Sequence, residues 1–307
     1  MKLSTHVAAF ALTALAATTA LKADTTATNS ASTNSVATGK DVKAPVAPVT
    51  PASPLFNLNV SENYDSRYMF RGINVIPNAG ILSTTVDPIW HITANDTLSM
   101  PLWFATAVGK TAGNGMQNYR ELDVPLNYTH AIGNWTLGLG YQLYCYFNDT
   151  ALVSAAPGSH ISPHYQGIQN EINENVAYTF KTGIVTWTPS LTYYQELGTA
   201  NGYSYGSINP GSSFLTPALS ASIPLNKSGT ITFNPNTQLN FGFRYNDNQN
   251  GQALTGLNNW QIQLPITWQI TKVISLTGYY AYSYQYVNLF GTAPSLGWAG
   301  VSLGLSF

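Results

Sequence analysis

Residues 135–147 read Trp-Thr-Leu-Gly-Leu-Gly-Tyr-Gln-Leu-Tyr-Cys-Tyr-Phe, and this stretch decides the fold class. An apolar or aromatic side chain stands at every odd position from Trp135 to Phe147. A strict period of two places these side chains on one face of an extended strand and the remaining side chains on the other. The run is longer than the roughly 9–11 residues that a tilted strand needs to cross a bilayer. It therefore predicts a membrane-spanning β-strand.

The same alternation recurs from residue 55 to the end of the chain. Counting the alternating segments gives twelve strands, at 55–65, 78–93, 97–109, 118–131, 134–147, 167–180, 184–197, 213–225, 230–245, 258–270, 273–287 and 296–307. An even number of strands lets an antiparallel sheet close with both termini on one side. We therefore expect a twelve-stranded antiparallel transmembrane β-barrel over residues 55–307.

The connections between these strands alternate in length. Five are tight turns, at 94–96, 132–133, 181–183, 226–229 and 271–272. The others are longer, at 66–77, 110–117, 148–166, 198–212, 246–257 and 288–295. Short periplasmic turns and longer extracellular loops are typical of bacterial outer-membrane barrels. All four lysines beyond residue 54 lie in these connections, as expected where a charge facing lipid at mid-bilayer costs about 2–4 kcal/mol.

The composition excludes several classes of protein. Charged residues make up 8% of the 307 residues, whereas a soluble domain has about 25%. The net charge of −1 offers no positive surplus to nucleic acid. The single cysteine, Cys145, cannot form an internal disulfide and is expected to be an inert apolar residue. The polar faces of the strands are rich in Asn, Gln, Thr and Ser, which suits a hydrated lumen. A soluble β-sandwich with a polar exterior is the alternative.

Two segments precede the barrel. Residues 1–23 combine Lys2 with a short apolar run and a small residue before Asp24, which predicts a cleaved Sec signal peptide. Cleavage after Ala20 and an uncleaved anchor helix are the alternatives. Residues 24–54 contain no aromatic residue, Leu or Ile and have Pro at every third position from 45 to 54. This composition predicts a disordered, semi-rigid spacer.

Two further stretches carry a resemblance to known proteins. Residues 301–307 alternate apolar residues and end in Phe307, similar to the C-terminal signature by which the barrel-assembly machinery recognises outer-membrane barrels. Residues 64–73, Tyr-Asp-Ser-Arg-Tyr-Met-Phe-Arg-Gly-Ile, resemble the opening hairpin of the TorF-like porin family of proteobacterial outer-membrane proteins. The likeness covers about residues 55–90. It implies a porin-like barrel in the bacterial outer membrane whose substrate is poorly defined.

Most ionisable groups of the predicted barrel gather at its outer end. Strand alternation sends several of them, with some tyrosines, toward the lumen, where opposed charges would orient dipolar solutes. A rim of solvated, paired charges without selectivity is the alternative. We expect the loop at 148–166 to fold in and constrict the lumen. The candidate pore-lining residues are Arg71, Glu121, Asp123, Tyr144, Tyr146, Glu171, Glu196 and Arg244.

A second set of side chains is expected to meet the membrane surface. Aromatic residues form girdles at both interfaces of such barrels. Arg120 falls on the apolar face, where it would bind lipopolysaccharide phosphate or extend toward water. Besides Arg120, the candidate lipid-interface residues are Trp90, Trp135, Trp260, Trp268, Tyr282 and Phe307. The expected partners are outer-membrane lipid, lipopolysaccharide and the assembly machinery.

The sequence carries no enzymatic or cofactor motif. His160 and His164 have metal-ligand spacing for a helix, but Pro163 between them favours a loop. His91 and His130 have no nucleophile motif beside them. We therefore expect no enzyme, metal or cofactor, and predict a channel for passive diffusion of small polar, neutral or zwitterionic solutes. A barrel enzyme acting on lipid and a non-conducting structural or adhesive barrel are the alternatives.

Overall fold

The computed structural model describes residues 55–74, 76, 79–108, 119–148, 165–199, 211–247, 253–286 and 295–307. The predicted signal peptide and spacer lie outside the described residues, as do most of the long loops, including the one expected to constrict the lumen. Within these ranges, no helix is long and apolar enough to cross a membrane.

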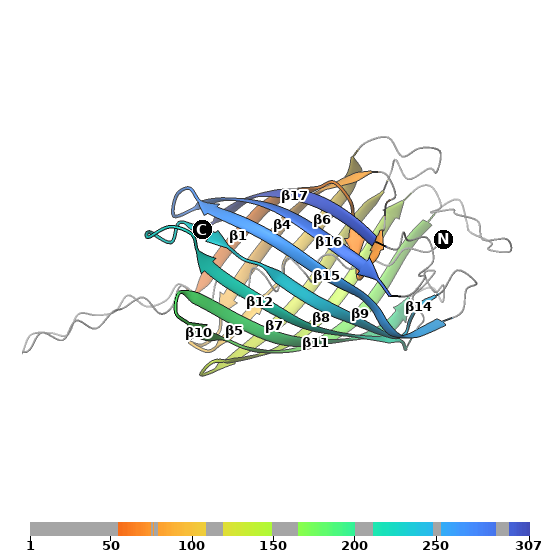
Figure 1. Ribbon diagram of the computed structural model, residues 1–307. Helices are drawn as coiled ribbons and strands as arrows, with labels where there is room; N and C mark the ends of the chain where they lie inside the picture. Colours follow the sequence, from red (N-terminus) through yellow and green to blue (C-terminus); the bar gives the residue numbers. More distant parts are fainter. Residues whose placement is uncertain are drawn as a thin grey trace, which may run out of the picture.

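The described chain forms a closed antiparallel β-barrel (Figure 1). Its first strand pairs with its last, and this pairing closes the sheet. Asn59 lies opposite Ser306, and Asp65 lies opposite Gly300. This confirms the predicted fold class. The wall strands are β1 (Phe56–Asp65), β4 (Gly80–His91), β5 (Asp96–Ser99), β6 (Leu102–Val108), β7 (Arg120–Ile132), β8 (Trp135–Asn148), β9 (Tyr165–Tyr178), β10 (Phe180–Thr182), β11 (Val185–Thr199), β12 (Ser213–Pro224), β13 (Ile231–Phe233), β14 (Asn236–Asp247), β15 (Ala253–Gln269), β16 (Ile274–Gln285) and β17 (Ser295–Ser306).

Three barrel strands are interrupted, so that fifteen wall segments make twelve strands. The break between β5 and β6 contains Pro101, and the break between β13 and β14 contains Pro235. Proline has no N–H to donate to a neighbouring strand, which weakens the pairing at these two breaks, although Pro88, Pro125 and Pro265 lie within uninterrupted strands. The third lies at Thr179, between β9 and β10. β15 begins at Ala253, earlier than the 258 expected from the alternation.

The two faces of the wall differ in chemistry as the alternation predicts. Apolar side chains such as Leu137, Leu139 and Tyr141 are exposed on the outside. The inward positions bury Asn59, Gln142 and many other amide and hydroxyl side chains. A protein in water would reverse this arrangement, because exposing the apolar face would cost about 25 cal/mol per Å². The outward face is therefore the lipid face, and the inward face is the polar lumen.

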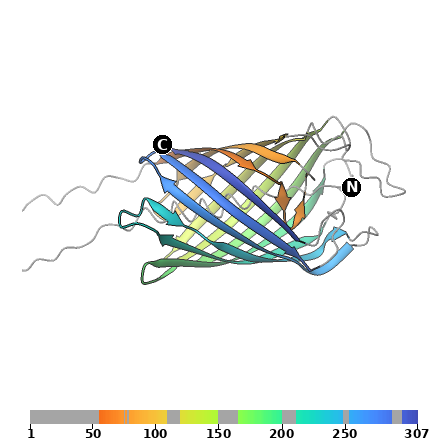
Figure 2. The ribbon, with the colours of Figure 1, turned by 45° about the horizontal axis from the view of Figure 1, so that its top comes forward.

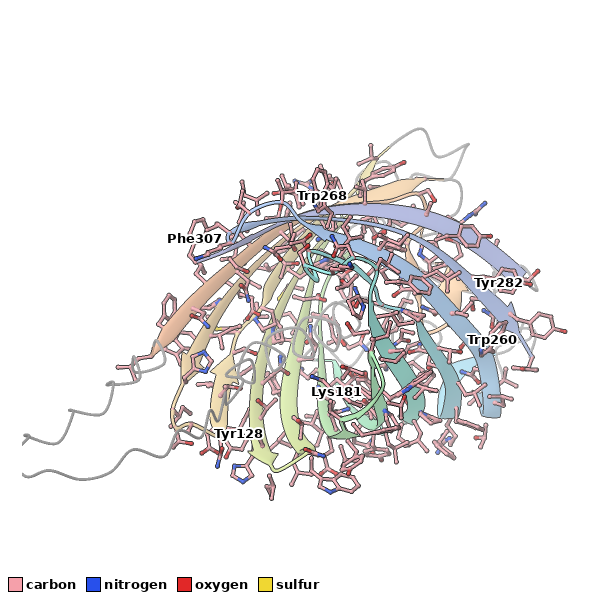
Figure 3. The ribbon with its side chains drawn as sticks, turned by 60° about the vertical axis from the view of Figure 1, so that its left-hand side comes forward. Tyr128, Lys181, Trp260, Trp268, Tyr282 and Phe307 are labelled. Atoms are coloured by element: carbon pink, nitrogen blue, oxygen red, sulfur yellow. The ribbon has the colours of Figure 1, made fainter. Side chains whose placement is uncertain are left out.

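Aromatic side chains project from the wall at both ends of the barrel (Figure 3). At the end with the short turns, the ring of Trp90 lies 5.8 Å from that of Phe56, and Trp135 lies 4.7 Å from Tyr178, measured between centroids. Toward the other end, Trp260 and Tyr282 are 6.3 Å apart. Such pairs are worth about 0.5–1.5 kcal/mol beyond their buried area. Three other candidate lipid-interface residues are also exposed on the outside: Arg120, Trp268 and Phe307.

Candidate functional site

A short hairpin occupies the lumen near the end opposite the short turns. It comprises residues 66–74, between β1 and β4, and contains β2 (Met69–Phe70) and β3 (Ile73–Asn74). We call it the inner hairpin. Figure 2 shows its two short strands, in orange, inside the barrel. Phe70 is 0% and Tyr68 1% exposed, although both belong to the connection at 66–77, which the strand pattern predicts as an extracellular loop. The inner hairpin therefore narrows the lumen from within.

The turn of the inner hairpin is left-handed at both central residues. Phe70 pairs with Ile73, so Arg71 and Gly72 form a two-residue turn, with φ of 43° and 86°. These values are typical of a type I′ turn, whose twist matches that of the flanking strands. A Cβ atom on Gly72 would lie 2.6 Å from the Asn259 side chain and 2.8 Å from Nε2 of Gln285. Position 72 therefore needs glycine both for its φ and for lack of space.

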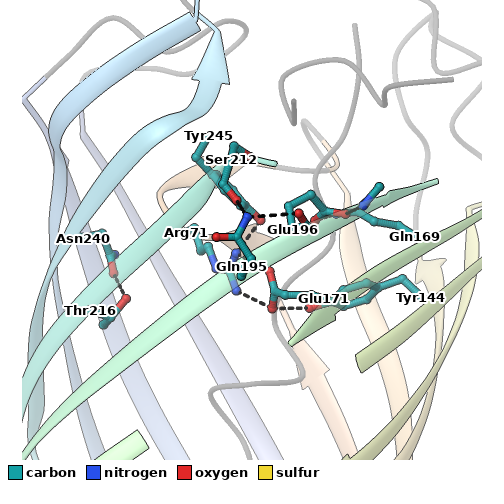
Figure 4. Close-up of polar contacts among 11 residues, drawn as sticks. Arg71, Tyr144, Gln169, Glu171, Gln195, Glu196, Ser212, Thr216, Asn240 and Tyr245 are labelled. Carbon is teal, nitrogen blue, oxygen red and sulfur yellow. Dashed lines mark hydrogen bonds and ion pairs between the residues drawn. The ribbon is translucent and has the colours of Figure 1, made fainter. Parts of the chain in front are cut away.

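Arg71 attaches the turn to the barrel wall (Figure 4). Its Nη1 and Nη2 each donate to a carboxylate oxygen of Glu171 on β9, both at 2.9 Å. Nη1 also donates to the hydroxyl of Tyr245 on β14. The guanidinium lies 4.0 Å from the ring centroid of Tyr194 and 4.8 Å from that of Phe214. This combination of a bidentate ion pair and ring stacking offsets the cost of about 1–2 kcal/mol for a non-glycine left-handed residue.

Tyr68 attaches the hairpin to another part of the wall, at β6 and β7. Its hydroxyl donates to Oε2 of Glu121 on β7 at 2.9 Å, and Tyr119 donates to the same oxygen. The ring of Tyr68 packs 5.8 Å from Trp103 and 5.7 Å from Tyr119. Burial, followed by the charge of Glu121, raises the pKa of the Tyr68 hydroxyl well above its ordinary value. The group therefore stays protonated and remains a donor.

Two more contacts complete the attachment. Met69 packs with Trp298 on β17 and Ala281 on β16. The side-chain amide of Gln285 donates to the carbonyl oxygen of Gly72. With Tyr68 and Arg71, the inner hairpin is therefore joined to strands on several sides of the barrel, and it bridges the lumen.

Four acidic residues expected to line the pore are buried on the inward face. Glu121, Asp123, Glu171 and Glu196 are each 2% exposed or less. Glu196 accepts from Nε2 of Gln169 at 2.6 Å and from the backbone N–H of Gly198 at 3.2 Å.

The environments of the acids and tyrosines differ. Asp123 is fully buried beside the carboxyl group of Glu121. Tyr144 donates to Oε1 of Glu171 at 3.3 Å, and Tyr146 is buried beside Tyr144. The structure thus brings Glu171, Tyr144 and Arg71 into one cluster and Glu121 into a second cluster around Tyr68.

The alternation fails at Arg244. The register between β14 and β15 shifts after Phe243, and Arg244 takes a φ of 56°. As a result Arg244 is exposed, and Tyr245 becomes the buried residue that contacts Arg71. From Phe243 to Asp247, β14 has four residue steps where the paired stretch of β15, from Thr255 to Ala253, has two, and this irregularity breaks the alternation of faces. The period-two pattern had assigned the inward position to Arg244.

Two other carboxylates, those of Glu62 and Glu174, face outward. Glu62 is exposed between Leu303 and Thr84, whose hydroxyl donates to it at 2.7 Å. Glu174 is exposed between Leu139 and Tyr193.

The histidines that the structure describes have local partners. His91 lies 3.0 Å from the amide of Asn57, and His130 lies 2.7 Å from Asp96. No group of three metal-ligating side chains occurs within the described ranges. His160 and His164 lie outside them.

A pocket lies beside the inner hairpin, and the wall strands that line it include β11, β12 and β14 to β17. The side chains that give it its chemistry are Asp65, Arg67, Gln238, Gln261, Gln263 and Tyr279. Sequence alternation identifies the glutamines as inward-facing, but not the proximity of Asp65 and Arg67 to them.

Comparison with known proteins identifies the fold. No family model and no curated protein matches the chain, so the TorF-like assignment remains a resemblance. The chain is similar to the COG4313 outer membrane channel from Pseudomonas putida F1, with a TM-score of 0.55 and 11% identity over 83% of this chain and 97% of that one. Less similar are the β domain of the Bordetella autotransporter BrkA (TM-score 0.47, 10% identity, 82% and 98% covered) and the NanC porin (0.44, 14%, 81% and 98%). The chain has the fold of bacterial outer-membrane barrels.

Proposed function

We propose that this protein is an outer-membrane channel for passive diffusion of small polar solutes, narrowed by the inner hairpin. The observation that carries the proposal is the lumen lining. Buried amide atoms of Asn127, Gln142 and Gln238 have no protein partner among the described residues. Buried polar groups in proteins are almost always hydrogen-bonded, to protein or to water. Such a lining fits a wet passage better than a packed core.

The same lining supports neutral or zwitterionic solutes. The inward faces of β14 and β15 present Gln238, Asn240, Asn259 and Gln261, which are uncharged donors and acceptors. They replace the hydration of a polar solute without attracting one sign of charge. This lining would stabilise a strongly charged solute less than water does, so such a solute should pass slowly.

The proposal includes a location and partners. Because the outward face is apolar with aromatic girdles, we place the barrel in the outer membrane, after Sec export and removal of residues 1–23. Arg120 would meet lipopolysaccharide phosphate, and Phe307 would engage the barrel-assembly machinery. We propose no enzymatic activity.

Planar-bilayer recording of the purified full-length protein tests the channel. We expect discrete conductance steps, with similar permeation of small cations and anions. A liposome-swelling assay should show faster entry of a small neutral sugar than of a multiply charged solute of similar size. Absence of any conductance step would overturn the proposal.

A plugged structural barrel is the second candidate, because the inner hairpin buries Phe70 and Tyr68 in the lumen. Deleting residues 67–73 distinguishes the two. A silent wild type together with a conducting deletion variant would establish a plugged barrel, and the passive-channel proposal would be wrong.

A further inference from the structure

The pocket beside the inner hairpin contains one acid and one base that are close in the chain but not paired. Asp65 ends β1 and Arg67 follows two residues later, and both line the pocket. No ion pair joins them in the part of the chain that the structure describes. Opposite charges that share a half-buried pocket normally pair unless the geometry keeps them apart.

The Arg67 guanidinium is available to a ligand. It is half-buried, and within the described ranges no hydrogen bond or ion pair engages it. Arg71, the other guanidinium of the pocket, is already held by Glu171. A guanidinium presents a planar fork of N–H donors that matches a carboxylate. Arg67 is therefore the group that would bind the carboxylate of a solute.

Asp65 supplies the opposite charge. One of its oxygens, Oδ1, accepts from the hydroxyl of Tyr279. This bond fixes the carboxylate at the pocket wall and leaves Oδ2 for another donor. An ammonium group carries three donors and no acceptor, so it fits that oxygen.

The glutamines of β14 and β15 supply the third element. Gln238 is 4% exposed, and its Oε1 has no partner among the described residues, although it lines the pocket. Gln261 lies directly opposite Gln238 across the strand pair. Together these amides offer donors and acceptors to an uncharged polar group on a solute.

We propose that this pocket binds a small zwitterion of the α-amino acid class. Its carboxylate would bind Arg67, its ammonium Asp65, and a polar side chain Gln238 and Gln261. The inference deepens the proposed channel function and names its solute class. A site for a simple anion would have no use for Asp65, and a site for a neutral sugar would have no use for either charge.

Calorimetric titration of the full-length protein in detergent tests the site with three probes. L-Glutamine is the zwitterion, 4-carbamoylbutanoate lacks the ammonium, and 4-aminobutanamide lacks the carboxylate. We expect L-glutamine to bind at least about tenfold more tightly than either analogue, because each lacks one charge-assisted contact. Equal binding of 4-carbamoylbutanoate would establish a plain anion site and overturn the proposal, as would no binding of L-glutamine.

Variants separate the two charges. Arg67→Gln and Asp65→Asn should each weaken L-glutamine binding by about tenfold or more, whereas Arg120→Gln, at an exposed arginine on the outside, should leave it unchanged. Folding of each variant is checked by its resistance to SDS without heating. If the Arg67 variant does not fold, Gln238→Leu decides, with an expected loss of severalfold. Unchanged binding in the folded variants would refute the site.

Failure of this inference and failure of the channel are distinguishable, since binding in detergent requires no conductance. A conducting barrel that does not bind L-glutamine retains the channel and loses the pocket. A silent barrel that binds it retains the pocket and loses the channel.

Discussion

Replacing Arg71 by Ala should release the inner hairpin from one side of the lumen. The change removes both hydrogen bonds to Glu171, the bond to Tyr245 and the stacking on Tyr194. The contacts of Tyr68 and Met69 on the other sides remain. The hairpin should therefore detach more often without unfolding the barrel.

The expected magnitude follows from burial. The side chains of Arg71 and Glu171 are 6% and 1% exposed, so the ion pair is shielded from water. Removing one partner of such a pair costs about 3–5 kcal/mol, because the other charge stays buried alone. Taking 3 kcal/mol, and 1.4 kcal/mol for each factor of ten, the detached population should rise at least about a hundredfold.

Thiol labelling measures this population. Met69 is buried beside Trp298, so Met69→Cys in a Cys145→Ser background should react with a polar maleimide only when the hairpin detaches. Adding Arg71→Ala should raise the labelling rate about a hundredfold or more. Arg120→Ala is the matched control, because Arg120 is an exposed arginine outside the lumen. Single-channel conductance should rise in parallel.

If Arg71→Ala labels within threefold of the parent, the ion pair does not hold the hairpin. A further check is the double variant Arg71→Ala with Glu171→Ala. It should label no faster than the single variant, because the second change removes the carboxylate that was left buried and unpaired.

Three other substitutions have expected effects on urea unfolding of the folded barrel. Tyr68→Phe should lower the free energy of unfolding by about 1.5–3 kcal/mol through loss of its bond to the Glu121 carboxylate; a change below 0.5 kcal/mol would mean that the bond contributes nothing. Gly300→Ala should cost about 1–3 kcal/mol, because a Cβ there would overlap the Tyr279 ring, whereas Gly278→Ala meets nothing within 4 Å and should cost far less; equal losses would contradict this. Glu174→Leu should stabilise the barrel by about 1 kcal/mol, since the carboxylate faces lipid; destabilisation would indicate an unrecognised partner.

The barrel wall could be predicted from the sequence because its physics is local. Each strand must show an apolar side chain to lipid at every second position, and Trp135 to Phe147 does so without a break. The turn residues then set which connections are short. The register, the strand interruptions and the irregularity at Arg244 depend on pairing between strands, which the alternation within one strand does not determine.

The inner hairpin could not be predicted in this way, because the loop sequence has no regular alternation of apolar and polar residues. A signal did exist on the strands. Tyr194 and Phe214 fall on inward positions that are otherwise occupied by Thr, Ser and Glu. Large aromatic side chains on a polar face indicate that another group packs against them, and here Phe70 shares their cluster and the guanidinium of Arg71 lies over their rings.

The stretch that carries the family resemblance is the one that the structure places in the lumen. Within it, Arg71 and Gly72 satisfy opposite demands of one turn. Gly72 is required because its φ is positive and no Cβ fits beside Asn259. Arg71 is strained in the same conformation, and any glycine there would relieve the strain. The arginine is tolerated because its ion pair with Glu171 contributes more than the strain costs. The Arg71–Glu171 ion pair therefore acts with the contacts of Tyr68, Met69 and Gln285 in holding the hairpin across the lumen.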